Sequence, residues 1–220
     1  MIPGPGESAG SPPEHHSVLS RAGRPRAWET ARGTIPLDRP LLVGILNVTP
    51  DSFSDGGRFI EPAAALRQAE DLLADGAGML DVGAESTRPG TARVPADEEW
   101  RRLAPVLDQL ARRFPSSPFS VDTTRAAIAL RALEAGAWAI NDVSALRLDP
   151  GIAEVCSRFD AGLVLMHSRG STAEMAGYTW ARYEDVAVAV AAELTEAVEL
   201  AVSAGVGRER LVLEIGRAHV

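Results

Sequence analysis

Lysine is absent from the 220-residue sequence, and all 22 of its basic residues are arginines. Such a bias indicates a GC-rich coding sequence rather than a physical requirement of the fold. Cysteine is almost absent too, because Cys156 is the only one. A disulfide within the chain is therefore excluded and a reducing cytoplasm is the simplest compartment. Cys156 is expected to pack as a small hydrophobic residue.

Long apolar runs are missing as well. No stretch approaches the ~20 apolar residues that span a bilayer, and the amino terminus lacks the apolar core of a signal peptide. Acidic residues also outnumber basic ones, so the formal net charge is −8. Phosphate backbones are bound by clustered basic residues, so this balance argues against a general nucleic-acid binder. We therefore expect neither a membrane nor a nucleic acid as a partner.

The length of the chain and its 45% share of hydrophobic residues suffice for one large domain with a substantial core. Residues 1–25 are rich in Gly, Pro, Ser and His and show no periodicity, which predicts a disordered tail. Residues 26–220 are expected to form the single domain.

From Leu41 onward, short apolar strands alternate with longer amphipathic helices, a pattern typical of parallel strands joined by right-handed crossovers. The expected strands are Leu41–Leu46, Met79–Val82, Phe119–Val121, Trp138–Ile140, Leu163–Met166 and Leu211–Leu213. The expected helices run from Pro62 to Gly76, from Asp97 to Arg113, from a cap at Thr123 or Thr124 to Gly136, from Asp149 through Phe159, and from Tyr183 to Ala204.

This alternation fits either an open doubly wound sheet or an incomplete eight-stranded barrel. Polar residues follow the apolar runs, namely Asn47, Asp81 with Glu85, Asp122, Asn141 with Asp142, His167 and Glu214. Barrel enzymes draw catalytic groups from the carboxyl ends of many strands, whereas an open sheet concentrates them at one switch point. No GxGxxG or Walker sequence follows the first strand. The pattern favours an α/β TIM (β/α)8 barrel with about six of its eight strand-helix units present. A hairpin from Trp28 to Leu37 is expected to close its bottom.

Five segments at these strand ends carry the polar residues that a binding site needs: GILNVTPDSFSDGG (44–57), DVGAESTRPG (81–90), SVDT (120–123), AINDV (139–143) and LMH (165–167). Arg88 offers a fork of donors to phosphate oxygens, and Asp122 can accept two adjacent hydrogen bonds from an aminopyrimidine edge. Taken singly, the first segment is only a polar turn and Asp122 only a helix cap. Taken together, the segments resemble the signatures of dihydropteroate synthases and the wider pterin-binding family.

The resemblance implies a transferase of folate biosynthesis. Its reaction condenses 6-hydroxymethyl-7,8-dihydropterin diphosphate with p-aminobenzoate to give 7,8-dihydropteroate and pyrophosphate. The implied catalytic residues are Asn47, Asp55 and Arg88, and Asn47 would also help to hold a Mg²⁺ ion bound to the diphosphate. The implied substrate contacts are Phe53, Thr87, Arg88, Pro89, Asp122, Asn141 and Met166. A cytoplasmic location, a homodimer of the full-length protein and a sulfonamide target are implied as well, whereas His167 is expected to be structural.

The chain departs from the family pattern after Leu213. Glu214 stands where the family has a pterin-binding aspartate, and residues 214–220 resemble the translation of a sequencing adaptor. We therefore expect a C-terminally truncated chain with little synthase activity alone, and hypothesise that residues 214–220 are not native. Two alternatives stay open: a methyltetrahydrofolate methyltransferase-type pterin-binding domain and a non-catalytic pterin-binding paralogue.

Overall fold

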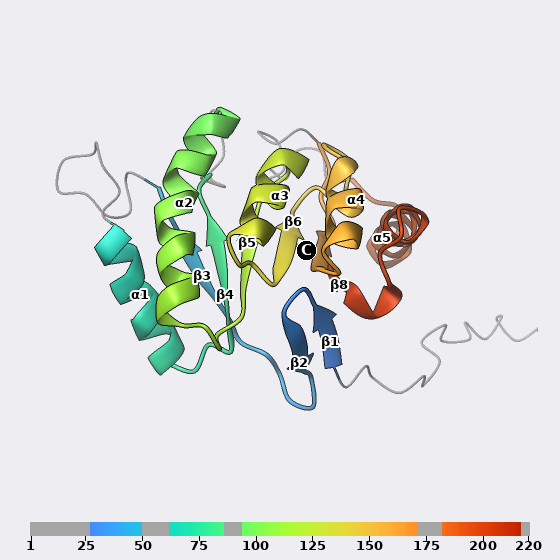
Figure 1. Ribbon diagram of the computed structural model, residues 1–220. Helices are drawn as coiled ribbons and strands as arrows, with labels where there is room; N and C mark the ends of the chain where they lie inside the picture. Colours follow the sequence, from blue (N-terminus) through green and yellow to red (C-terminus); the bar gives the residue numbers. More distant parts are fainter. Residues whose placement is uncertain (1–26, 50–61, 86–93, 171–181, 217–220) are drawn as a thin grey trace, which may run out of the picture.

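The computed structural model describes residues 27–49, 62–85, 94–170 and 182–216. Their strands form a short antiparallel pair and a six-stranded parallel sheet (Figure 1). The strands are β1 (Ala27–Thr30), β2 (Gly33–Pro36), β3 (Val43–Asn47), β4 (Met79–Gly83), β5 (Phe119–Asp122), β6 (Ala139–Asp142), β7 (Gly162–Met166) and β8 (Leu211–Glu214). The helices are α1 (Pro62–Ala74), α2 (Ala96–Arg113), α3 (Ala126–Glu134), α4 (Gly151–Arg158), α5 (Val186–Ser203) and the short 3-10 helix η3 (Arg208–Arg210).

The parallel sheet follows the order of the chain, from β3 through β4, β5, β6 and β7 to β8. One α-helix lies between each strand of this sheet and the next. An open doubly wound sheet would reverse its strand order at a switch point, and no reversal occurs in this sheet. The fold is therefore an incomplete TIM barrel with six of its eight strands in the described residues, as the sequence predicted.

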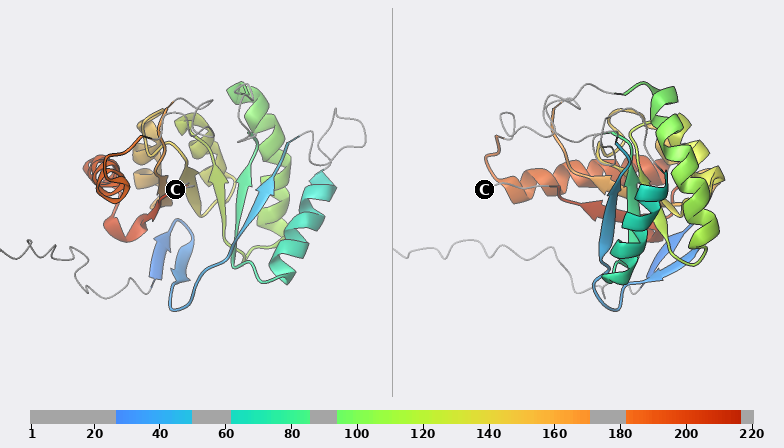
Figure 2. Two further views of the ribbon diagram at one scale, coloured as in Figure 1. Left: turned by 180° about the vertical axis from the view of Figure 1, so that it is seen from behind. Right: turned by 90° about the vertical axis from the view of Figure 1, so that its left-hand side faces the viewer.

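Helices α1 to α4 cover the outer face of this sheet, as the views from behind and from the side show (Figure 2). Side chains alternate between the two faces along each strand, so every second one points toward the helices. The outward side chains are apolar and almost fully buried: Leu46, Leu80, Val82, Val121, Ile140, Leu163 and Leu165. They join the buried apolar side of the helices, including Leu103 and Leu107 of α2, in one core. This core leaves the inner face available for polar residues.

The β1–β2 hairpin closes the amino-terminal end of the inner face. Trp28 and Ile35 of the hairpin pack against Met79 and Ala139, which begin β4 and β6. A methyl group added at Gly162 would lie 2.7 Å from the Trp28 ring, so only glycine permits this approach. The Trp28 Nε1–H donates to the carbonyl of Arg210 at 2.9 Å. The prediction of a hairpin that closes the bottom of the barrel is confirmed.

The predicted cap of α3 is wrong. The helix begins at Ala126, and neither Thr123 nor Thr124 occupies its N-cap position, which is Arg125. The Ala126 N–H instead donates to Asp149 Oδ2 at 2.7 Å. The other oxygen of Asp149 accepts from the Gly151 N–H at 3.1 Å, at the start of α4. One carboxylate from a distant loop thus satisfies the first turns of two helices.

Helix α5 begins three residues later than the sequence predicted. The carboxylate of Asp185 accepts hydrogen bonds from Ala187 N–H at 3.0 Å and Val188 N–H at 3.1 Å, which defines the N-cap. Across the described part of the chain, no helix is long and apolar enough to cross a membrane. Cys156 is buried as expected, and burial together with the Asp142 charge raises the pKa of its thiol to about 12.

Candidate active site

The inner face of the sheet carries polar residues toward the carboxyl ends of the strands. Asp81 of β4 is the Cα partner of Ser120 of β5, and one step further along the sheet Asp122 is the partner of Asn141 of β6. Partners in parallel strands point to the same face. The register therefore brings Asp122 and Asn141, predicted as substrate contacts from separate segments, side by side.

Asp81 orients the amide of Asn141. The Ser120 hydroxyl donates to Asp81 Oδ1 at 2.6 Å, and Asn141 Nδ2 donates to Asp81 Oδ2 at 2.9 Å. An ionised carboxylate only accepts hydrogen bonds, so the amide nitrogen of Asn141 must face it. Asn141 Oδ1 is then left buried without a hydrogen-bond partner within the described residues. A buried acceptor without a donor is costly, so this oxygen suits an N–H group of a ligand.

Several carboxyl groups at this end of the sheet resist ionisation. Burial raises the pKa of Asp122 well above its usual range, and the charges of Asp81, Asp142, Glu99 and Glu85 raise it further. Burial also raises the pKa of Asp81, although the Ser120 and Asn141 hydrogen bonds oppose that shift. Such a site favours a ligand that supplies hydrogen-bond donors, because donors stabilise the ionised carboxylates.

Asn47 lies on the edge strand β3 at the same end of the sheet. It is the Cα partner of Gly83, and a methyl group added at Gly83 would lie 3.8 Å from Asn47 Oδ1 and 3.5 Å from Asp122 Oδ2. Gly83 therefore leaves open the space between these two side chains. Within the described ranges, no group of three or more His, Cys, Asp or Glu side chains could hold a metal ion.

Met166 and Glu214 border the site from the other side. They are Cα partners in β7 and β8. Gly216 lies beside Met166, and a methyl group added at Gly216 would come within 3.8 Å of Met166 Sδ. Partial desolvation raises the pKa of Glu214, and the nearby charge of Asp81 adds to the shift. Glu214 therefore belongs to the same electrostatic environment as Asp81.

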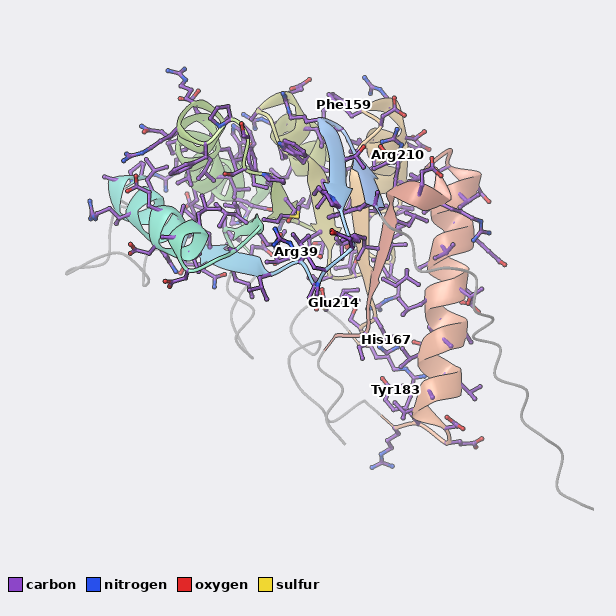
Figure 3. The ribbon with its side chains drawn as sticks, turned by 90° about the horizontal axis from the view of Figure 1, so that it is seen from below. Arg39, Phe159, His167, Tyr183, Arg210 and Glu214 are labelled. Carbon is purple, nitrogen blue, oxygen red and sulfur yellow. The ribbon has the colours of Figure 1, made fainter. Side chains whose placement is uncertain are left out.

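The contacts of His167 support the structural interpretation. Its Nε2 lies 2.9 Å from Glu193 Oε2 on α5, and its ring centroid lies 6.1 Å from that of Tyr183. Its backbone N–H donates to the carbonyl of Glu214 at 2.7 Å. Figure 3 shows His167 and Tyr183 beside α5. His167 thus joins the end of β7 to the helix that follows it.

Five predicted site residues lie outside the described residues: Phe53, Asp55, Thr87, Arg88 and Pro89. The sequence prediction had not assigned roles to Asp81, Glu99 or Arg125, which the structure brings close to Asp122 or its neighbours. Glu99 did leave a sequence signal, since it occupies the same helix face as Leu103 and Leu107 at steps of four residues. A glutamate on an apolar helix face becomes buried, so its carboxylate needs a hydrogen-bond donor or a positive charge beside it.

Comparison with known proteins matches residues 43–218 to the family described as pterin binding enzyme. The dihydropteroate synthase of Bacillus subtilis (strain 168) is 40% identical over 179 residues, which cover 81% of this chain and 59% of the relative. The chain therefore spans about three-fifths of the length of this curated relative.

Two solved structures are similar in sequence and in fold. The Xanthomonas albilineans dihydropteroate synthase with 4-aminobenzoic acid has a TM-score of 0.78 and 39% identity, and the match covers 88% of this chain and 67% of that chain. The Burkholderia cenocepacia dihydropteroate synthase complexed with 7,8-dihydropteroate has a TM-score of 0.75 and 36% identity, covering 87% and 64%.

Proposed function

The chain belongs to the pterin-binding enzyme family, and on that premise we propose that it serves as a dihydropteroate synthase of folate biosynthesis. Its substrates are 6-hydroxymethyl-7,8-dihydropterin diphosphate and p-aminobenzoate. Binding of 4-aminobenzoic acid by the Xanthomonas albilineans enzyme and of 7,8-dihydropteroate by the Burkholderia cenocepacia enzyme supports both substrate classes.

The unpaired, buried Oδ1 of Asn141 beside Asp122 is the observation that carries this proposal. The pyrimidine edge of a pterin presents an amino group and a ring N–H, which are donors side by side. Asp122 accepts hydrogen bonds from that edge, and Asn141 Oδ1 accepts a further N–H. The donors also offset the cost of ionising Asp122, whose pKa is raised when no ligand donates to it. Met166 borders the pterin ring.

The condensation needs no covalent enzyme nucleophile. The bond between the pterin methylene carbon and the diphosphate oxygen breaks, and its electrons leave with pyrophosphate. The amine of p-aminobenzoate forms the new C–N bond and then loses a proton. Arg88 stabilises the charge of the leaving diphosphate, while Phe53, Asp55, Thr87 and Pro89 order p-aminobenzoate and exclude water.

Asn47 would help to hold a Mg²⁺ ion that arrives with the diphosphate, since Gly83 beside it leaves space next to Asn47 Oδ1. Asn47 supplies one amide oxygen, and Mg²⁺ commonly takes its remaining ligands from phosphate and water. When bound, the ion would neutralise charge on the leaving group. A cytoplasmic location and a homodimer stay predictions.

Isothermal titration calorimetry of the purified chain with the pterin diphosphate, followed by p-aminobenzoate, tests the proposal. We expect one pterin to bind per chain. Replacement of Asn141 by Ala should weaken pterin binding about tenfold or more, because the acceptor Oδ1 is lost and an N–H of the pterin is left without its partner. The control Thr195→Ala changes an exposed side chain on α5 that bonds only its own helix. Unchanged pterin affinity in Asn141→Ala, or no pterin binding by the unaltered chain, would contradict the proposal.

A further inference from the structure

A group of charged and polar side chains lies next to Asp122, and we call Arg125, Glu85, Glu99 and Thr123 the Arg125 cluster. Arg125 Nη1 donates to Glu85 Oε1 at 2.8 Å and also to Glu99 Oε2. The Thr123 hydroxyl donates to Glu99 Oε1 at 2.7 Å. Glu99 is only 1% exposed, so its carboxylate depends on these two donors.

The cluster holds both ends of segment 86–93. Glu85 precedes the segment and Val94 follows it. The Val94 N–H donates to Glu85 Oε1 at 3.1 Å, and Arg125 Nη2 donates to the Val94 carbonyl at 2.6 Å. From α2, Arg102 Nη1 donates to the Ala84 carbonyl at 3.1 Å. One guanidinium therefore binds the residues on both sides of the segment.

The same cluster is joined to the strand ends that carry the proposed pterin contacts. Thr123 directly follows Asp122, and its N–H donates to the carbonyl of Asn141 at 3.1 Å. The Arg125 N–H donates to the Thr123 hydroxyl at 3.3 Å. A displacement of Arg125 would therefore shift Asp122 and Asn141 as well as Val94.

We propose that Arg125 is a positioning residue. Through Glu99 and Thr123 it fixes the strand ends that carry Asp122 and Asn141 relative to Glu85 and Val94. The link to a ligand rests on the proposed function, in which Asp122 and Asn141 bind the pterin, so Arg125 keeps these two side chains in the arrangement that receives it. Arginine suits this role because its planar fork donates in several directions at once, which an ammonium group on a flexible stem does not.

The variants must separate positioning from general stability. Arg125→Met alone would leave Glu99 as a buried, unpaired carboxylate and destabilise the fold. The double variant Arg125→Met/Glu99→Gln removes that charge and keeps an acceptor for Thr123. Arg131→Met on α3 is the matched control, because it also removes a guanidinium, which stacks on the Trp100 ring at 4.3 Å and takes no part in the hydrogen bonds of the cluster described above.

Hydrogen exchange at the Val94 amide gives a readout that needs no ligand. In the double variant we expect exchange at least about tenfold faster, since the Val94 carbonyl and Glu85 lose their common donor. Arg131→Met should exchange at the rate of the unaltered chain. Equal exchange in the double variant and the control would overturn the positioning role.

Calorimetry then tests the link to function. The double variant should bind the pterin diphosphate about tenfold or more weakly than the unaltered chain, because Thr123, which directly follows Asp122, loses its charged support, while Arg131→Met should bind it as the unaltered chain does. Faster exchange with unchanged pterin affinity would overturn the link between Arg125 and the ligand. A failure of the unaltered chain to bind pterin would count against the proposed function, while the exchange rates would still decide the positioning role.

Discussion

Adjacent residues on the same strands meet opposite surroundings. On the outer face, Leu80, Val121 and Leu163 are at most 1% exposed and pack against helices in one apolar core. On the inner face, Asp81 and Asp122 are held among other carboxyl groups, and burial raises the pKa of both. The outer face removes apolar surface from water, whereas the inner face keeps charged groups where charge is unfavourable.

Alternate side chains of a strand point to opposite faces of the sheet. Residues that stabilise the fold and residues that bind a ligand can therefore be neighbours on the same strand. Apolar burial on the outer face stabilises the fold at roughly 25 cal/mol per Å². The inner carboxyl groups lower stability at neutral pH, because the folded state disfavours their ionised forms. Such costly groups fit a binding site, in which a ligand supplies the missing donors.

The largest effect is expected from deleting an outward side chain. Leu165→Ala should lower the free energy of unfolding by about 2–5 kcal/mol, since a fully buried leucine leaves a cavity. Denaturant unfolding measures the loss. The control is Leu213→Ala, because Leu213 is the Cα partner of Leu165 but is 48% exposed. Equal losses at the two positions would contradict the distinction between buried and exposed outer positions.

An inner-face change should have the opposite sign. Asp122→Asn is expected to raise stability at pH 7, by about 1.4 kcal/mol for each unit by which the pKa of Asp122 is raised. In the unaltered chain the unfolded state releases this proton first as pH rises above about 3.9, so stability falls until the raised pKa is passed. The gain should therefore disappear below about pH 3.9.

Urea unfolding between acidic and neutral pH measures this effect, with Asp71→Asn on the exposed side of α1 as the control. Pterin affinity, measured by calorimetry on the same variant, should fall because a carboxylate acceptor is lost. A loss of stability at pH 7 would show that Asp122 stabilises the fold rather than serving the site at the expense of stability.

The smallest effect is expected from a surface ion pair. Arg112 and Asp108 of α2 lie 2.9 Å apart, with side chains 79% and 54% exposed. Arg112→Ala should change the free energy of unfolding by no more than about 0.5 kcal/mol, because exposed pairs are solvated and screened. Thermal unfolding at low and high salt checks this. A change above about 1 kcal/mol would mean that exposed ion pairs contribute to the free energy of unfolding alongside apolar burial.

Much of the fold could be predicted from the sequence. Apolar runs of strand length alternating with amphipathic helices follow from local side-chain chemistry, and all six parallel strands are observed near their predicted positions. The hairpin at Trp28 and the polar residues at the strand ends could also be predicted, because both are visible in the local order of side chains. In the site, Asp122 and Asn141 were identified from their segments, and the structure brings them together.

Tertiary structure alone decided which distant groups satisfy one another. Asp149 caps α3 from 23 residues away, Asp81 orients Asn141 from 60 residues away, and Arg125 reaches Glu85 across 40 residues. A carboxylate or guanidinium can pair with any of many partners in a sequence, and only the packing of strands and helices selects one. The sequence by itself therefore determined the alternating elements and the residue types at the mouth of the barrel. Folding decided their partners, because burial makes each unpaired polar group costly and so enforces particular contacts.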